Sequence, residues 1–302
     1  MEIADSLYNV SETDIFKAKS LMLSASLYEQ AGGLKKAIEY GKRADKALKK
    51  SNDYAWKTRI LGFLASQHRS LSLYNESEKY VNRAIEAAKK IESSKRAEVT
   101  LGLLEQEKAM GKSESGDFRE AIVHFDKAGE YFEKSEAETL LIAQNHQFKG
   151  QAFLGLNEYD DAIPEFYKVL DLWGDMPDNY IKGMSYIGLS QAYSETNRLN
   201  LAKESLNLAD KTLKGSEYLE VLEALWDAKI EYYKAANEFD LLKTAYERRD
   251  SINHEIKKQK NLFLDYSFNE LSQENLKNSK NQKLKNYALA GGSLVILAGL
   301  AL

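Results

Sequence analysis

The chain has 302 residues, of which 43% are hydrophobic and 29% are charged, enough for two ordinary domains or one elongated array. It contains only two prolines and 17 glycines, a composition that favours helix over sheet. The net charge of -4 gives no electrostatic reason to expect nucleic acid as a partner. The lack of cysteine excludes disulfides, thiolate nucleophiles and cysteine-ligated metal ions.

A pattern with a period of about 40 residues runs through most of the chain. In five of the six periods a small side chain stands where the two helices of a hairpin would meet, with Leu242 in the sixth, and we call this the anchor position. Seven residues later a second small side chain usually follows on the same face. One such hairpin cannot bury its apolar face alone, so the pattern predicts stacked neighbours. The anchor positions are Ala37, Ser77, Ala121, Ala162, Ala202 and Leu242.

Each predicted hairpin also has a turn former and a large apolar residue at fixed distances before its anchor. The turn formers can end the first helix in a left-handed conformation or cap the second helix. The large apolar residues predict a contact that closes the same hairpin. The turn formers are Gly32, Ser72, Gly116, Asn157, Asn197 and Asn237. The large residues are Leu34, Tyr74, Phe118, Tyr159, Leu199 and Phe239.

This pattern resembles the tetratricopeptide repeat (TPR) family, and the fourth hairpin carries the resemblance best. The resemblance implies an all-α fold, a right-handed superhelical solenoid of about six TPR-like hairpins. The period exceeds the family's usual value of about 34 residues, a difference that longer helices absorb. The repeat-core signature consists of Ala37, Ala121, Gly150, Tyr159, Ala162, Phe166, Ala202 and Ala209.

In proteins of this family the first helix of each hairpin faces a concave groove, which binds a protein or an extended peptide. The resemblance therefore implies a candidate binding surface on the first helices. Several of its residues are glutamines, whose amides offer both a donor and an acceptor to a peptide backbone. A merely solvated polar face is the alternative interpretation. The candidate surface consists of Arg59, Arg69, Gln106, Gln144, Gln147, Gln151 and Gln191.

Catalytic chemistry is not indicated by any cluster of residues. The four histidines are scattered without metal-ligand spacing, and His68 takes a position where a ring should pack between helices. Asp160 and Asp161 open a predicted helix, where carboxylates suit the helix dipole. The chain lacks a phosphate loop and a nucleophile elbow. The sequence therefore predicts no enzyme, no cofactor and no catalytic or metal-binding residue.

The last part of the chain differs from the repeats. Residues 250–285 contain no proline or glycine and predict a long helix, either a coiled coil that joins two copies of the chain or a single solvated helix. Residues 286–302 carry no charge and predict the start of a transmembrane helix that the sequence cuts short. An apolar helix packed on the body is the alternative. Lysines before this run favour the cytoplasmic side for the repeats.

These features predict an N-terminal extension (1–12), a repeat array (13–249), a linker helix (250–285) and a membrane segment (286–302). The arrangement resembles bacterial membrane-anchored regulators and sensor proteins with a helical-repeat input domain, whose output domain would lie beyond Leu302. An adaptor held by a C-terminal membrane anchor is the alternative. The resemblance implies the bacterial inner membrane. It leaves open whether the repeats face the periplasm or the cytoplasm.

Overall fold

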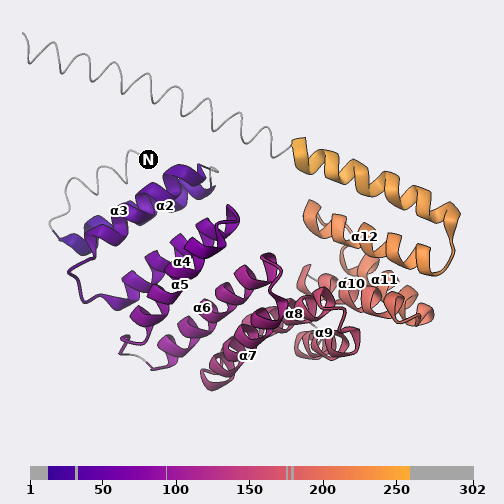
Figure 1. Cartoon of the computed structure of the whole chain (residues 1–302), viewed down its shortest axis with the longest axis horizontal. Helices are drawn as coiled ribbons and strands as arrows, with labels where there is room; N and C mark the ends of the chain where they lie inside the picture. Colours follow the sequence, from indigo (N-terminus) through magenta and orange to yellow (C-terminus); the bar gives the residue numbers. More distant parts are fainter. Residues whose placement is uncertain (1–12, 31–32, 93, 175, 178–179, 259–302) are drawn as a thin grey trace, which may run out of the picture. The chain divides into compact units, whose positions relative to one another are not determined.

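The computed structural model describes residues 13–30, 33–92, 94–174, 176–177 and 180–258 (Figure 1). Residues 1–254 form one compact unit, and its described part consists of helices and short connections without a strand. The all-α prediction is therefore confirmed for these residues. The helices are α2 (Asp14–Gln30), α3 (Leu34–Ala47), α4 (Tyr54–Ser70), α5 (Tyr74–Ala88), α6 (Ser94–Glu114), α7 (Phe118–Lys134), α8 (Thr139–Gly155), α9 (Tyr159–Trp173), α10 (Tyr180–Glu195), α11 (Leu199–Thr212) and α12 (Leu219–Ala235), and residues 239–258 are also helical.

Consecutive helices pack in pairs, and each pair is one hairpin. The pairs are α2 with α3, α4 with α5, α6 with α7, α8 with α9, and α10 with α11. The even-numbered first helices also contact one another, α4 with α6, α6 with α8, α8 with α10, and α10 with α12. Each hairpin thus packs on the next one along the chain, as a repeat array requires.

A residue in the left-handed conformation ends the first helix at five of the six predicted turns. The values of φ are 57° at Ser72, 87° at Gly116, 60° at Asn157, 56° at Asn197 and 58° at Asn237. The next residue donates its backbone N–H five residues back, as Glu158 does to the Phe153 carbonyl over 3.0 Å. This is the Schellman closure, which glycine and asparagine favour because they tolerate a positive φ. The predicted turn formers are therefore confirmed at the described positions.

The anchor positions form a seam of close helix contacts. The side chains of Ala37, Ala121, Ala162 and Ala202 are 0% exposed, and that of Ser77 is 3% exposed. Leu242 in the sixth hairpin is only half-buried. The seam is thus tightest in the first five hairpins.

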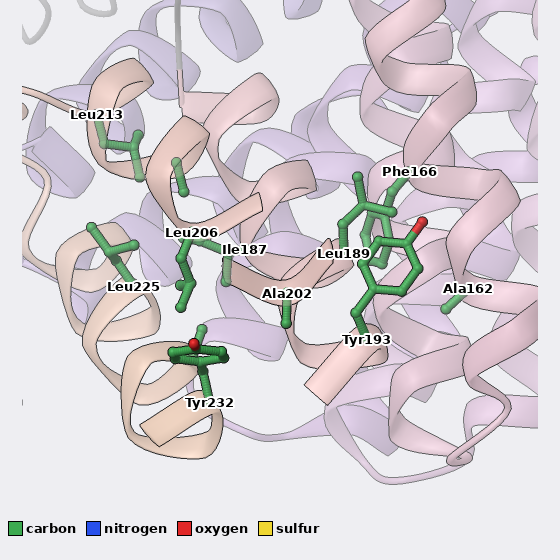
Figure 2. Close-up of a cluster of buried hydrophobic side chains, with 12 residues drawn as sticks. Ala162, Phe166, Ile187, Leu189, Tyr193, Ala202, Leu206, Leu213, Leu225 and Tyr232 are labelled. Carbon is green, nitrogen blue, oxygen red and sulfur yellow. The ribbon is translucent and has the colours of Figure 1, made fainter. Parts of the chain in front are cut away.

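Phe166 of α9 fills the space between α8 and α10, and it is fully buried beside Leu189 and Tyr193 (Figure 2). A Cβ atom built on Gly150 of α8 would lie 2.7 Å from the Phe166 ring, and one built on Gly188 of α10 would lie closer still. Real Cβ atoms do not approach a ring so closely. The ring is therefore matched to a glycine on each flanking first helix.

The large apolar residues that begin the second helices differ in what they contact. Phe118, the first residue of α7, packs against α8 of the following hairpin, where a Cβ atom on Gly155 would lie 2.6 Å from its ring. Phe239 occupies the same position in the sixth hairpin and is 65% exposed. Phe118 also packs against a cluster that contains Ala109 and Ala121 of its own hairpin and Ala152 of the next one, so its ring links two repeats.

The predicted linker helix and membrane segment lie mostly outside the described residues. Residues 250–258 continue the helix that begins at residue 239, and residues 259–302 are not described. Within the described ranges, none of the helices combines the length and the apolar character that a membrane span requires.

Candidate functional site

Polar contacts join the first helices of successive hairpins, and we call them the polar ladder. Each contact of the polar ladder connects residues at nearly equivalent positions of neighbouring repeats. Arg69 Nε donates to Glu107 Oε1 over 2.8 Å, and Gln144 Nε2 donates to Tyr180 Oη over 3.3 Å. The remaining rungs are Gln67 with Glu29, Gln106 with Asn145, and Gln191 with Glu231. Four of the predicted binding residues therefore hold repeats together.

Gln106 and Gln147 are buried, with exposed fractions of 5% and 2%. They occupy equivalent positions of α6 and α8, fifteen residues before the anchors. The same position holds Met22 in the first hairpin and Ile187 in the fifth, and both are buried. In these four hairpins it is therefore a contact position between helices. The side chains of Gln106 and Gln147 are therefore not part of a solvated polar face, which was the alternative interpretation.

Arg69 also forms ion pairs with carboxylates of the protein itself. Besides Glu107 it pairs with Glu114, and its side chain is only 14% exposed. Burial raises the pKa of Glu107, and the hydrogen bond from Arg69 opposes that rise. Arg69 therefore stabilises the contact between α4 and α6.

A cavity of about 500 Å³ lies along α4 and α6, and we call it the α4–α6 cavity. Its floor includes apolar side chains, and Leu103 is 40% exposed within it. Two guanidinium groups, the amide of Gln106 and the carboxylate of Glu107, which pairs with Arg69, add polar chemistry to its wall. The residues that matter for its chemistry are Trp56, Arg59, Phe63, Arg96, Leu103 and Met110.

The rim of this cavity is positively charged. The Arg59 guanidinium lies 5.1 Å from the centre of the Trp56 ring, and Lys19 Nζ of α2 lies 5.2 Å from it. Such distances allow cation–π attraction, which holds both charges at the ring. Among the described residues, no carboxylate forms an ion pair with Arg59, Arg96 or Lys19. The rim thus offers cations that the protein itself does not neutralise.

The structure brings together only part of the predicted surface. Arg59 and Gln106 line the α4–α6 cavity, whereas Gln144, Gln151 and Gln191 lie on α8 and α10 and do not line it. Sequence reasoning missed Trp56, Phe63, Arg96 and Leu103. Leu103 carried a usable signal, because it stands eighteen residues before its anchor, as Arg59 does. Arg96 lies close to the start of α6 and belongs to no position of the repeat pattern.

The other end of the first-helix row is acidic. Glu231 of α12 is half-buried, and burial raises its pKa while the hydrogen bond with Gln191 opposes the rise. The negative charges of Glu195 and Asp227 raise the same pKa further. The first helices therefore pass from unpaired cations near α4 to crowded carboxylates near α12.

Two histidine–carboxylate pairs, one buried and one partly buried, need a separate account, because such pairs can transfer protons in open active sites. His124 Nδ1 lies 2.6 Å from Glu105, and His146 Nδ1 lies 2.6 Å from Glu165. Each pair joins the two helices of one hairpin, and neither lines the α4–α6 cavity. His68 packs against the Tyr80 ring, with 4.9 Å between ring centres. The structure gives these histidines packing roles, as the sequence predicts for His68.

Comparison with known proteins identifies solved structures with a similar fold. No family model matches the chain, and no curated protein matches it in sequence. The apo form of RapI is similar in structure, with 17% identity, a TM-score of 0.68, and 85% of this chain and 90% of that chain covered. A Rap protein complexed with Competence and Sporulation Factor shares 17% identity, with a TM-score of 0.61 and coverages of 82% and 67%.

Kinesin light chain TPR-like repeats from Podosopora anserina are similar as well, with 14% identity, a TM-score of 0.56, and 69% of this chain and all 100% of that chain covered. At such identities the likeness concerns the fold. Together with the hairpins, the left-handed turns and the buried anchors, it shows that this chain has a TPR-like helical-repeat fold.

Proposed function

We propose that this chain is a non-enzymatic domain that binds an extended protein or peptide segment along its first helices. The α4–α6 cavity carries the proposal, because it joins an apolar floor to cations that lack carboxylate partners in the described chain. The structural likeness to a Rap protein solved in complex with a factor supports a binding role.

The chemistry of the cavity suits an acidic segment that presents one large apolar side chain. The apolar side chain would lie against Phe63 and Leu103, where it would remove exposed hydrocarbon from water. Carboxylates on either side of it would pair with Arg59 and Arg96, because a guanidinium binds a carboxylate through two parallel hydrogen bonds. Both groups lie at the surface, so this pairing serves specificity and association rate as well as affinity.

An array of ten-residue peptides, followed by fluorescence anisotropy on the peptides that bind, tests this proposal. We expect the bound peptides to be rich in Asp and Glu and to contain an aromatic or large aliphatic residue. The double variant Arg59→Gln with Arg96→Gln should weaken binding by about tenfold or more, because it removes two charge-assisted contacts. Leu103→Asp should weaken peptide binding similarly, because the new carboxylate repels an acidic peptide.

The matched control is Arg248→Gln, which removes an exposed arginine outside the cavity. It should bind like the wild type. The proposal fails if the array selects no acidic, apolar-containing peptides, or if the cavity variants keep wild-type affinity while circular dichroism shows that they are folded.

The role of this domain in a larger protein is a further part of the proposal. We propose the sensory or scaffold input of a membrane-anchored regulator, with the anchored adaptor as the alternative. The uncharged run 286–302, outside the described residues, supports an anchor. Fractionation of bacterial cells that express the chain should find it with the membrane, and deletion of 286–302 should release it. An unchanged distribution after the deletion would rule out this anchor.

A further inference from the structure

A second cavity, of about 730 Å³, lies along the second helices α3 and α5 and the start of α4, and we call it the basic cavity. It shares no lining residue with the α4–α6 cavity. Six cationic and two acidic side chains line it, although the whole chain has a net charge of -4. The cationic residues are Lys42, Lys46, Lys49, Lys57, Arg83 and Lys90.

The two carboxylates of the basic cavity already form ion pairs with cations of the protein. Asp45 pairs with Arg83 over 2.8 Å, and Glu86 pairs over 2.8 Å with Lys89, which does not line the cavity. Within the described part of the chain, the five lysines of the cavity form no ion pair. Like charges on neighbouring helices repel one another, so an anion bound among them would lower the energy of the site.

Tyr54 brings two of these lysines to one place. Lys57 Nζ of α4 lies 5.4 Å from the centre of the Tyr54 ring, and Lys90 Nζ, which follows α5, lies 5.3 Å from it. Both distances permit cation–π attraction. One ammonium group thus comes from α4 and the other from the residues just after α5, and both lie near the same ring.

Helix electrostatics explain only part of this charge. Lys46 lies in the last turn of α3, where a cation suits the dipole. Lys57 lies in the first turn of α4, where the dipole disfavours a cation. A solvated helix face does not explain it either, since the charges converge on one concavity from three helices.

We infer that the basic cavity binds a small ligand carrying several phosphate groups. Its volume lies within the range of about 300–1,000 Å³ that is usual for small-molecule sites. Lysine is a common phosphate ligand because its ammonium is a compact point charge with three donors. An extended acidic peptide would be matched better by a row of charges than by charges around one concavity. This site is independent of the function proposed for the α4–α6 cavity.

Isothermal titration calorimetry with tripolyphosphate, at low and at high salt, tests the inference on the whole chain. We expect saturable binding that weakens as salt rises, because salt screens the lysines. Lys46→Gln with Lys49→Gln should lower the affinity by about tenfold or more. Both lysines are exposed, so the variant should fold.

The repeat supplies a matched control, because Lys211 and Lys214 of the fifth hairpin stand at the positions equivalent to Lys46 and Lys49. Lys211→Gln with Lys214→Gln changes the net charge equally and should leave tripolyphosphate binding unchanged. Absence of saturable binding, or an equal loss in the control, would overturn the inference.

Two further probes separate a small ligand from larger polyanions. Phosphatidylserine vesicles and a polyglutamate peptide should bind more weakly than tripolyphosphate at equal charge concentration. If either binds more tightly and loses its binding in the Lys46→Gln, Lys49→Gln variant, the surface recognises a membrane or an acidic protein instead, and the small-ligand inference is wrong.

Discussion

Ala162→Glu should lower the free energy of unfolding by more than about 4 kcal/mol and the melting temperature by about 10 °C or more. Ala162 is 0% exposed and lies in one cluster with Phe166, Leu189 and Tyr193 (Figure 2). A carboxylate at this position would lose its water without gaining a partner, which is among the costliest changes in a core.

The same substitution should also change how the protein unfolds. Among the helices α2 to α12, each hairpin packs mainly on its neighbours, so a broken fourth hairpin uncouples the first three from the last two. We expect the wild type to unfold in one thermal transition and the variant to unfold in two. Hydrogen exchange followed by mass spectrometry should show early exchange in α8, α9 and α10.

Two control substitutions test the position rather than the charge. Val123→Glu places a carboxylate at a site of α7 that is 50% exposed, and it should cost no more than about 0.5 kcal/mol. Leu242→Glu changes the anchor of the sixth hairpin, which is half-buried, and should cost less than Ala162→Glu. Wild-type unfolding of Ala162→Glu would show that the seam is assigned to the wrong face.

The fold could be predicted from sequence because its key positions are governed by local physics. A left-handed turn needs a residue such as Asn157 or Gly116, and a close helix contact needs a small one such as Ala162. Neither requirement depends on distant parts of the chain. The contact between Phe118 and Gly155 escaped prediction for the opposite reason, because Gly155 belongs to another hairpin.

The candidate site could be predicted only in part, because its residues follow different rules. A glutamine looks polar wherever it stands, yet the position of Gln147 is a helix contact that Met22 and Ile187 also occupy. A comparison of equivalent positions could have revealed this. Arg96 could not be found in that way, since it stands outside the repeat pattern and reaches the cavity only through the stacking of α6 on α4.

The basic cavity shows a further limit of sequence averages. A net charge of -4 over 302 residues gives no sign of a cationic site. The lysines come from three helices or the residues that follow them, and Lys42 and Lys90 are far apart in the sequence. Stacking of the first two hairpins gathers them, so the concentration of charge is a property of the tertiary structure.

Glu165→Gln should lower the free energy of unfolding at pH 7 by about 3 kcal/mol. Burial alone would raise the pKa of Glu165, but hydrogen bonds from His146 and Lys168 and the charge of Lys149 lower it to about 2. A carboxyl group whose pKa is lower in the folded state stabilises the fold above its unfolded pKa. That stabilisation is lost as the pH falls towards 2.

The difference between wild type and Glu165→Gln should therefore be full at pH 6 and should shrink as the pH falls from about 4.5 to 2. Urea unfolding across this range measures it. Glu130→Gln, which removes an exposed glutamate of α7, should change stability little at every pH. A difference between wild type and Glu165→Gln that stays constant with pH would mean that Glu165 stabilises the fold by packing rather than by charge.

The third hairpin contains the same pair in reverse, and this allows a rescue experiment. Glu105 stands at the position of His146, and His124 stands at the position of Glu165. The cations also correspond. In the third hairpin Lys108 and Lys127 stand three residues after Glu105 and His124. In the fourth hairpin Lys149 and Lys168 stand three residues after His146 and Glu165.

Because this position already accepts both orientations, His146→Glu combined with Glu165→His should recover much of the stability that Glu165→Gln loses. The reversed carboxylate would lie three residues before Lys149, as Glu105 lies before Lys108. If the reversed variant is as unstable as Glu165→Gln, the two pairs have different surroundings. The two hairpins would then be equivalent in their backbones but not in the side chains around these pairs.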